Sequence, residues 1–255
     1  MIAGIFHSGS GLGNQLHRYV MARVLALDKG TDFGMVYSYQ FKGKDFMNLD
    51  MGYYADAMNF FKTANIFQEK KVVNEYGDDI RDYDWEGINL IKDNTIIDGE
   101  FQGERYYEHH LKEIDEWLKV EPLDMPDDLC IIGFRGGEYA GVPDLFLPEE
   151  YWQKAIHDMK LKYPRIRFEV HTDDPETASK FFPDYTCIHD IGLNWRSVRY
   201  AKHLIIANSS FYILPALLGN AKEVIAPKYW AGYNKGFWQL EQNFYKKFNY
   251  IHHED

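Results

Sequence analysis

The stretch 204–218 constrains the fold of this chain more than any other. It starts with an apolar run, passes through Asn208, Ser209 and Ser210, and continues as a second apolar run that stops at Gly219. This order predicts a buried strand, a polar turn and a helix. Free backbone N–H groups, hydroxyls and the helix dipole converge at such a helix start, which predicts an anion site. Simple N-capping by Ser209 or Ser210 is the alternative.

The second half of the chain alternates strands with helices. Apolar runs predict strands at 129–134, 166–171, 203–207 and 223–226, and helical spacing predicts helices near 149–161, 175–182, 194–201 and 210–218. This alternation predicts a parallel sheet with helices on its faces. Ligands of such sheets bind where the strands end.

The N-terminal segment predicts an α/β unit of its own. Residues 2–6 predict a strand, residues 9–15 a glycine turn and residues 16–27 a helix. Asn14 stands where the third glycine of a dinucleotide fingerprint belongs, and the Gly-Lys-Ser/Thr ending of a P-loop is missing. Nicotinamide, flavin and P-loop nucleotide sites are therefore disfavoured.

Residues 32–126 follow a less regular pattern that is rich in Tyr, Phe, Asp and Asn. Within it, residues 96–107 predict a strand that leads into a polar, aromatic loop. The Pro/Asp stretch 121–128 is the best linker candidate. The expected domains are residues 1–126 and 127–255.

Composition and charge exclude several classes of protein. The 255 residues are 45% hydrophobic and 16% aromatic, which is ample for a core. A net charge of −11 without a Lys/Arg-rich run argues against a nucleic-acid partner. Cys130 and Cys187 have no Cys-x-x-Cys spacing, so we expect buried free thiols, as in a reducing compartment. The apolar N-terminus is too short for a signal peptide and no run would span a membrane, so we expect a soluble, cytoplasmic protein.

Polar residues follow the predicted strands of the second half. Arg135 follows the first of these strands, and Gly136 and Gly137 let a ligand approach the backbone closely. A guanidinium in this position can clamp a phosphate with paired hydrogen bonds, although an Arg in a surface turn fits the pattern equally well.

Asp173 and Asp174 follow the next strand. Thr172 or Asp173 is expected to cap the helix that begins near Pro175, or a free carboxylate there accepts hydrogen bonds from a nucleoside. The Asp-Asp pair matches the Asp-x-Asp of metal-dependent sugar transferases only loosely. No His/Asp/Glu set has the spacing of metal ligands, so neither a metal nor another cofactor is predicted.

Several short motifs follow one another in an order that a known family shares. They are Gly11-Leu12-Gly13-Asn14-Gln15-Leu16, Gly99-Glu100-Phe101-Gln102 with Tyr106-Tyr107, Gly133-Phe134-Arg135-Gly136-Gly137-Glu138-Tyr139, Leu147-Pro148 with Tyr151, Thr172-Asp173-Asp174, Ala207-Asn208-Ser209-Ser210-Phe211, and Ile225-Ala226-Pro227-Lys228 with Trp230. Over most of its length the chain thereby resembles glycosyltransferase family 11, the α-1,2-fucosyltransferases of a wider fucosyltransferase superfamily.

The resemblance implies an α/β, GT-B-like fold with two Rossmann-like lobes. An N-terminal lobe that handles a glycan acceptor, a C-terminal lobe that binds GDP-fucose and an inverting transfer without a required metal are expected. The donor-binding residues implied are Gly11, Gly13, Asn14, Arg135, Asp173, Asp174, Asn208, Ser209, Ser210 and Phe211. Gln102 and Tyr106 are the implied acceptor contacts. Arg135 is expected to stabilise the departing GDP, with Glu138 or Asp144 as the base for the acceptor hydroxyl.

The chain departs from the family's pattern around Arg135. Gly133 replaces a His, Gly136 replaces a second Arg, and Glu138 replaces an Asp. Residues 212–214, Tyr-Ile-Leu, replace Ser-Trp-Trp. Two alternatives therefore stay open, a transferase that uses a different nucleotide sugar and a non-catalytic relative that binds glycans or nucleotides.

Overall fold

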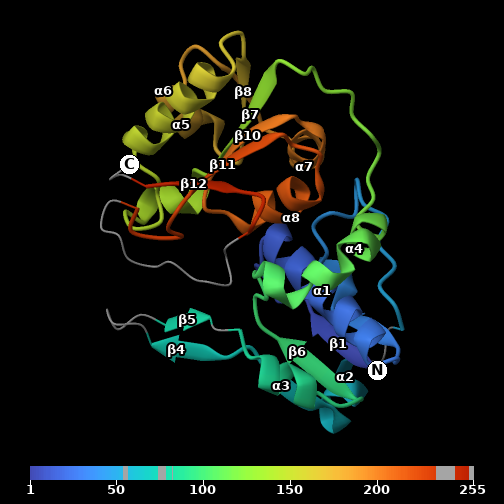
Figure 1. Ribbon diagram of the computed structural model, residues 1–255. Coiled ribbons are helices and arrows are strands. Elements are labelled where there is room, and N and C mark those ends of the chain that lie inside the picture. The colour runs from blue at the N-terminus through green and yellow to red at the C-terminus, as the bar shows by residue number, and fades with distance from the viewer. Residues whose placement is uncertain (54–56, 74–78, 82, 234–244, 253–255) are drawn as a thin grey trace. The chain divides into compact units, whose positions relative to one another are not determined.

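The chain forms two compact units, one of residues 1–120 and one of the described residues from 121 onward (Figure 1). This computed structural model describes residues 1–53, 57–73, 79–81, 83–233 and 245–252. Residues 118–128 are all described and none of them lies in a helix or strand. The Pro/Asp stretch is therefore an irregular connection between two folded units.

The first unit is built on a parallel four-stranded sheet with the strand order β2-β1-β6-β3. Its strands are β1 (Ile2–Ile5), β2 (Phe33–Val36), β3 (Asn65–Gln68) and β6 (Thr95–Asp98). All four residues of β1 are buried, as expected for a strand covered on both faces. Helix α1 (Leu12–Asp28) packs closely on this sheet at Gly4, because a Cβ there would lie 3.1 Å from Ala22 Cβ.

Short elements complete the first unit. They are η1 (Ser38–Gln40), α2 (Ala57–Thr63), the antiparallel pair β4 (Lys71–Val73) and β5 (Asp79–Arg81), α3 (Trp85–Leu90), η2 (Glu104–Tyr106), η3 (Glu108–His110) and α4 (Leu111–Trp117). The helices α2 and α4 have seven residues each, about two turns. Elements this short leave too few residues for a clear apolar period, which explains the irregular pattern of residues 32–126.

The second unit is built on a parallel six-stranded sheet with the strand order β12-β11-β10-β7-β8-β9. Its strands are β7 (Leu129–Phe134), β8 (Arg167–Thr172), β9 (Thr186–Ile188), β10 (His203–Ile206), β11 (Glu223–Pro227) and β12 (Asn249–Ile251). The central strand β10 is buried throughout. Because Phe134 pairs with Thr172 and Gly133 with Ile206, the carboxyl ends of β7, β8 and β10 meet at one edge.

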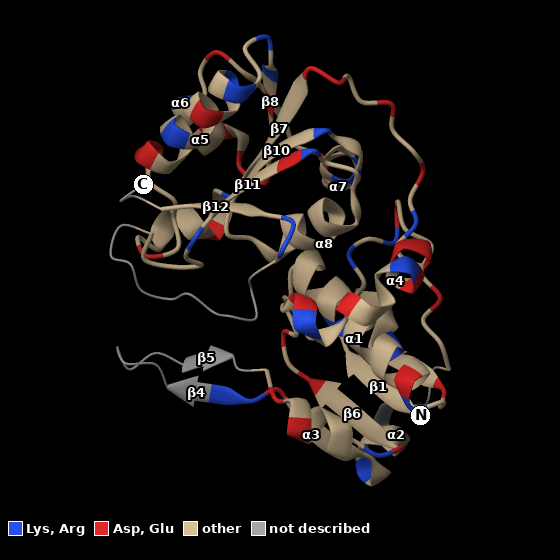
Figure 2. Ribbon diagram, viewed as in Figure 1, with Lys and Arg blue, Asp and Glu red and all other residues tan. Residues whose placement is uncertain are grey.

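Helices cover both faces of this second sheet. Figure 1 shows α5 (Glu149–Lys162) and α6 (Pro175–Phe181) on one face, with α7 (Ile191–Tyr200) and α8 (Ser210–Leu218) on the other. Right-handed crossovers between parallel strands produce this arrangement when the strand order reverses at β7. Lys and Arg are interspersed with Asp and Glu along α5 and α6 (Figure 2).

A lysine completes the carboxyl end of α8. Lys247 Nζ donates hydrogen bonds to Ala216 O at 2.9 Å and Leu217 O at 3.0 Å, and it also contacts the Gly219 carbonyl. A cation at this position satisfies carbonyls that have no partner within the helix. Burial, with the nearby charge of Arg199 as a smaller cause, lowers the pKa of Lys247 to about 8.

Two buried tyrosines hold the ends of the four central strands. The hydroxyl of Tyr212, on α8, lies 3.0 Å from Phe134 O in β7 and 3.1 Å from His171 O in β8. The hydroxyl of Tyr151, on α5, lies 2.7 Å from Ile206 O in β10 and 3.5 Å from Ile225 O in β11. Burial raises the pKa of both phenols, so both remain protonated donors.

The structure confirms the predicted alternation and corrects some boundaries. Helix α7 begins at Ile191 rather than near residue 194, because the Asp190 side chain caps it by accepting from Leu193 N at 2.6 Å. Helix α1 begins at Leu12, so part of the predicted glycine turn belongs to the helix. The strands β9 and β12 were not predicted, and each has only three residues.

Two further expectations concern cysteines and membranes. Cys130 and Cys187 are both free; Cys130 is buried as expected, whereas Cys187 is half-buried. In the part of the chain that the structure describes, no helix combines the length and the apolar character needed to cross a bilayer.

Candidate functional site

Arg135 lies directly after β7 and is held between two carboxylates. Its Nη1 forms an ion pair with Asp173, which follows β8, and its Nη2 lies 2.9 Å from Glu138 Oε1. The guanidinium also stacks over the Tyr139 ring, 5.1 Å from its centroid. The Arg135 side chain is 27% exposed and that of Glu138 is 78% exposed. Asp173 is thus the less exposed partner that fixes the guanidinium, and Glu138 is a solvent-exposed second partner.

The two aspartates after β8 organise the glycine loop after β7. Gly136 N donates to Asp173 Oδ1 at 3.0 Å, and Gly137 N donates to Asp174 Oδ2 at 3.2 Å. Asp174 is also the N-cap of α6, because its Oδ1 accepts from Thr177 N at 3.1 Å. Hydrogen bonds from Thr177, with a smaller one from the Gly137 amide, lower the pKa of Asp174.

The predicted cap of α6 was therefore wrong. Neither Thr172 nor Asp173 caps the helix; Thr172 Oγ1 instead accepts from Asp174 N at 2.9 Å, and Asp174 is the capping residue. The helix starts at Pro175, so the cap falls on the residue immediately before it.

The glycine loop cannot hold larger side chains as it stands. A Cβ on Gly136 would lie 2.6 Å from Asp174 Cβ. Gly137 has φ +42°, and a Cβ there would lie 2.4 Å from Asp173 Oδ2. A larger side chain at residue 136 would therefore require the Asp174 side chain to shift.

Gly133, which stands where the family's motif has a His, is also closely packed. A Cβ on Gly133 would lie 2.8 Å from Tyr212 Cε1 and 2.9 Å from Tyr212 Cδ1. The Tyr212 ring therefore occupies the space beside this strand position. Gly133 and Tyr212 therefore pack directly against each other.

The start of α8 lies at the same sheet edge, after β10. Ser209 is the N-cap residue, but its side chain makes no capping hydrogen bond, and Ser210 is the first residue of the helix. Asn208 is buried, and its Nδ2 donates to Leu145 O at 2.9 Å and also contacts the Trp230 carbonyl. Phe211 packs edge-on against Trp195 with ring centroids 5.9 Å apart. Simple side-chain capping does not explain the Ser-Ser pair.

The two candidate bases follow Arg135 in one loop. Glu138 lies in η4 (Gly137–Gly141) and contacts Arg135 directly. Asp144 lies beyond η4 in an exposed position, and its carbonyl oxygen accepts from Gly232 N at 2.6 Å. The structure thus brings Glu138 into the Arg135 cluster and places Asp144 farther along the loop.

The remaining predicted residues lie in the first unit. Gly11 is the N-cap of α1, and Gly13 and Asn14 lie in its first turn. Gln102 Nε2 donates to Asn14 Oδ1 at 2.9 Å, so these two motifs meet. Tyr106 is buried, and its hydroxyl donates to Glu69 Oε1 at 2.9 Å.

Sequence reasoning missed a pair of titratable residues at the edge of the first sheet. His7 Nε2 lies 2.7 Å from Asp98 Oδ1. His7 lies two positions beyond β1 and Asp98 ends β6, and these two strands are neighbours in the sheet. The side chains are 42% and 33% exposed, so the pair is open to solvent. A polar residue after each of these two strands was the signal that could have indicated this pair.

Arg18 braces the loop that follows Asp98. This buried side chain donates to Gly99 O, Ser10 Oγ and Glu100 Oε1, each at 2.7 Å. A guanidinium that binds two segments, one at Ser10 and one at Gly99 and Glu100, fixes the shape of the loop between them. The glycine segment 9–13 and the loop after β6 are therefore one connected polar surface of the first unit.

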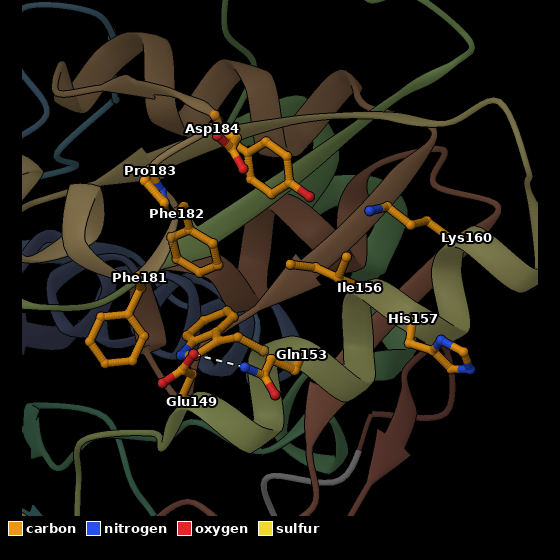
Figure 3. Close-up of a pocket in the computed structure, with 11 residues that line it drawn as sticks. Glu149, Gln153, Ile156, His157, Lys160, Phe181, Phe182, Pro183 and Asp184 are labelled. Carbon is orange, nitrogen blue, oxygen red and sulfur yellow. Dashed lines mark hydrogen bonds between the residues drawn. The ribbon is translucent and has the colours of Figure 1, made fainter.

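The second unit also has a hollow of about 330 Å³ beside α5 and the turn after α6 (Figure 3). Trp152, Phe181 and Phe182 line it, and Gln153 donates to Glu149 Oε1 at 2.7 Å on its wall. Its lining includes none of the candidate donor-binding residues. The hollow is therefore a separate feature from the strand edge that carries Arg135.

Metal-ligating side chains gather elsewhere in the molecule. Among the described residues, the group close enough to share one ion consists of Asp28, His109 and His110 in the first unit. Asp28 and His109 are 81 positions apart in sequence, so residue spacing gave no sign of this group.

Comparisons with known proteins bear on the fold. No family model matches the chain, and no curated protein sequence matches it. The chain is similar to the crystal structure of NodZ alpha-1,6-fucosyltransferase soaked with GDP-fucose, with TM-score 0.53 and 14% identity over 88% of this chain and 94% of that chain. It also aligns with E. coli heptosyltransferase WaaC with ADP, with TM-score 0.44 and 13% identity over 90% of this chain and 88% of that chain. The similarity to the fucosyltransferase structure confirms the predicted α/β, GT-B-like fold with two Rossmann-like lobes.

Proposed function

We propose that this protein is an inverting glycosyltransferase that transfers fucose from GDP-fucose to a hydroxyl of a glycan, with α-1,2 linkage. The observation that carries the proposal is the edge of the second sheet, where Arg135 follows β7 and the start of α8 follows β10. A guanidinium and a helix N-terminus are the two groups that hold a diphosphate without a metal. The likeness in fold to a fucosyltransferase soaked with GDP-fucose supports this donor.

The proposed chemistry needs charge stabilisation at the leaving group. The acceptor oxygen attacks the anomeric carbon of fucose, the bond from that carbon to the β-phosphate oxygen breaks, and GDP leaves with the bonding electrons. Arg135 and the amide groups at the start of α8 stabilise the negative charge that grows on the β-phosphate. The buried Tyr212 hydroxyl fixes the adjoining strand ends, so these donors need little rearrangement during the reaction.

We assign Asp173 chiefly to positioning Arg135. One of its oxygens pairs with the guanidinium and the other accepts from Gly136 N. Both oxygens are thus engaged inside the loop, which favours this role over the direct nucleoside contact expected from the sequence.

Glu138 is the first candidate for the acceptor base. It is the exposed partner of Arg135, so an incoming diphosphate can take its place on the guanidinium and release the carboxylate. Asp144 in the same loop and His7, oriented by Asp98, are the alternatives. Acceptor contacts are assigned to the first unit, on the polar surface that includes Asn14 and Gln102.

A transferase specific for another nucleotide sugar is the second candidate function. Tyr212 and Asp174 occupy the spaces beside Gly133 and Gly136, so the His and the second Arg of the family's motif have no counterparts at these positions. Recognition of the sugar and the base could therefore differ, while the diphosphate site stays the same.

A panel of donors tests the proposal. Calorimetric titrations with GDP, UDP and ADP are expected to show tight binding of GDP alone. Incubation with GDP-fucose and a panel of glycans is expected to give a fucosylated product, whose linkage NMR identifies. Binding of UDP or ADP in place of GDP would support the second candidate. GDP binding without transfer or hydrolysis of GDP-fucose would instead indicate a non-catalytic relative.

A further inference from the structure

Three metal-ligating side chains meet where α1 ends beside η3. Asp28 is the last residue of α1, and His109 and His110 are the last two residues of η3. His109 Nε2 lies 3.1 Å from Asp28 Oδ2, and His110 Nε2 lies 2.8 Å from Asp28 Oδ1. All three ligand atoms lie within 4.8 Å of one another. Both imidazoles therefore direct their Nε2 atoms at the carboxylate of Asp28.

A fourth residue, Glu113, lies beside the other ring nitrogen of His110. His110 Nδ1 is buried and lies 3.5 Å from Glu113 Oε2, one turn further along the chain. His110 Nδ1 makes no hydrogen bond within the part of the chain that the structure describes, and Glu113 is the carboxylate near enough to accept its proton. A carboxylate that accepts from Nδ1 favours the tautomer whose Nε2 carries the free lone pair. The His110 side chain is 18% exposed, so its orientation is held by packing.

The local field also favours a cation. Asp28 stands at the carboxyl end of α1, which carries the negative end of the helix dipole. The last turn of α1 contains no basic residue. Glu113 adds a second carboxylate beside His110. Lys29 follows α1 as its C-cap residue, and a positive charge bound between Asp28 and the two histidines would add to the compensation at this end of the helix.

We propose that Asp28, His109 and His110 bind one divalent transition-metal ion, with zinc as the best fit. Two imidazole nitrogens and one carboxylate oxygen are ligands that zinc prefers, whereas magnesium and calcium prefer oxygen ligands alone. Ligand bonds of about 2.0–2.2 Å place tetrahedral ligand atoms about 3.3 Å apart. The Asp28–His109 and Asp28–His110 pairs thus need to open only slightly. Solvent can supply the fourth ligand, since His109 is 45% exposed.

We expect this metal site to affect the stability of the first unit rather than catalysis. Asp28 and Asn14 lie fourteen positions apart on α1, about 21 Å along the helix axis, so the metal is remote from the glycine segment. It joins the end of α1 to the segment before α4, which are far apart in sequence. Zinc binding should therefore stabilise the first unit against unfolding while leaving the glycosyl-transfer chemistry unchanged.

Zinc titration of the untagged, metal-stripped full chain tests this proposal. Calorimetry should give one zinc ion per chain, and zinc should raise the melting temperature of the wild type. Asp28→Asn and the double variant His109→Ala/His110→Ala should weaken zinc binding at least 100-fold, whereas His157→Ala on α5 should bind as the wild type does. Equal zinc binding by all four proteins, or binding displaced by a modest excess of magnesium, would overturn it.

A variant outside the ligand set covers the case in which the ligand variants fail to fold. Glu113→Gln keeps all three ligands but loses the carboxylate behind His110, so zinc affinity should fall about 10-fold or more. Cobalt in place of zinc adds a spectroscopic readout, because a tetrahedral cobalt site absorbs visible light strongly. An unchanged affinity in Glu113→Gln together with no such absorption band would contradict the assignment.

Discussion

The Tyr212 ring fills the space beside Gly133, so that a single added carbon on Gly133 would stand 2.8 Å from it. The two residues come from different elements, since Gly133 is in β7 and Tyr212 is in α8. Tyr212 also ties the adjoining strand ends through its hydroxyl. The positions are therefore coupled, and neither can change freely without the other.

Gly133→Ala should lower the free energy of unfolding by about 1–3 kcal/mol, because the new methyl group overpacks the Tyr212 ring. Urea unfolding measures this loss. Gly141→Ala is the matched control, because a Cβ there meets no atom within 4 Å. In a double-mutant cycle, Gly133→Ala should cost less in a Tyr212→Ala background than in the wild type. Strict additivity of the two changes would contradict the coupling.

Arg135→Ala should reduce turnover of GDP-fucose roughly 30- to 1000-fold, equivalent to about 2–4 kcal/mol of transition-state stabilisation. In the proposed mechanism Arg135 faces the β-phosphate, so its loss would leave the charge of the leaving group unstabilised. Steady-state kinetics with a fixed acceptor provide the measurement.

The control for Arg135 is a second arginine–aspartate pair on the same sheet. Arg167 begins β8, so it lies at the amino ends of the strands, away from the carboxyl ends that carry Arg135. Its Nη2 lies 2.9 Å from Asp128 Oδ1. Arg167→Ala should leave turnover unchanged. Asp173→Asn should show part of the Arg135→Ala defect, because it removes the carboxylate that holds the guanidinium. Near-normal turnover in Arg135→Ala would remove Arg135 from the mechanism.

One of three variants, Glu138→Gln, Asp144→Asn or His7→Gln, should lower kcat by roughly 10²–10⁴ while leaving GDP affinity intact. That signature marks the acceptor base, since the base acts only on the acceptor hydroxyl. Calorimetry with GDP and turnover, measured on the same preparations, identify it. If His7 is the base, Asp98→Asn should lower kcat in the same direction. Normal kcat in all three variants would mean that the transfer uses none of these groups.

In the proposed mechanism Arg135 and the start of α8 take the role that a metal plays in metal-dependent sugar transferases, so transfer should survive an excess of EDTA. The same treatment should lower the melting temperature of zinc-loaded protein, through the site at Asp28. A fixed-temperature assay well below the melting transition separates the two effects. Loss of transfer that manganese or magnesium restores would instead assign a metal to Asp173 and Asp174.

Lys247→Met should change how stability depends on pH. The pKa of Lys247 is about 8 in the folded chain against an ordinary value of 10.5. Between these values the unfolded chain binds more protons, so this lysine makes the wild type more stable as the pH rises from about 8 to about 10.5. The gain is lost as the pH falls back through that window. Unfolding free energies measured across this range should rise less steeply with pH in Lys247→Met.

Lys180→Met provides the reference for Lys247. Lys180 lies on α6 with a 68% exposed side chain, where it pairs with Glu176 at 3.1 Å. This variant should follow the wild-type slope. The same slope in Lys247→Met and in the wild type would show that the buried ammonium does not titrate in this window.

The ends of four strands in the second half were predictable from sequence, because β7, β10 and β11 are largely apolar and β8 alternates polar and apolar residues. The runs at β7, β8 and β10 predict that Arg135, Asp173 and Asn208 lie at one edge of the sheet. The structure shows the ends of these strands at one edge. The strands β9 and β12 were not predicted, because three residues are too few to show a hydrophobic period.

Side-chain partnerships were far less predictable than the fold. Asp174 rather than Asp173 caps α6, and the only sequence sign of this was Pro175, which favours the first helical position and so places the cap directly before it. The packing of Tyr212 on Gly133, the His7–Asp98 pair and the Asp28 cluster each join segments that are distant in sequence. Such pairs depend on tertiary packing, which local spacing does not encode.

The tyrosine hydroxyls of α5 and α8 have a consequence for how this sheet edge can change over evolutionary time. They fix the ends of the four central strands from within the helices, so the spacing of those ends does not depend on the loops that carry the ligand-facing residues. Loop sequences can then diverge, lengthen or be exchanged while the frame beneath them stays constant. An engineer who wished to change the donor sugar could therefore graft new loops between β7 and α5, provided that Tyr151 and Tyr212 were left in place.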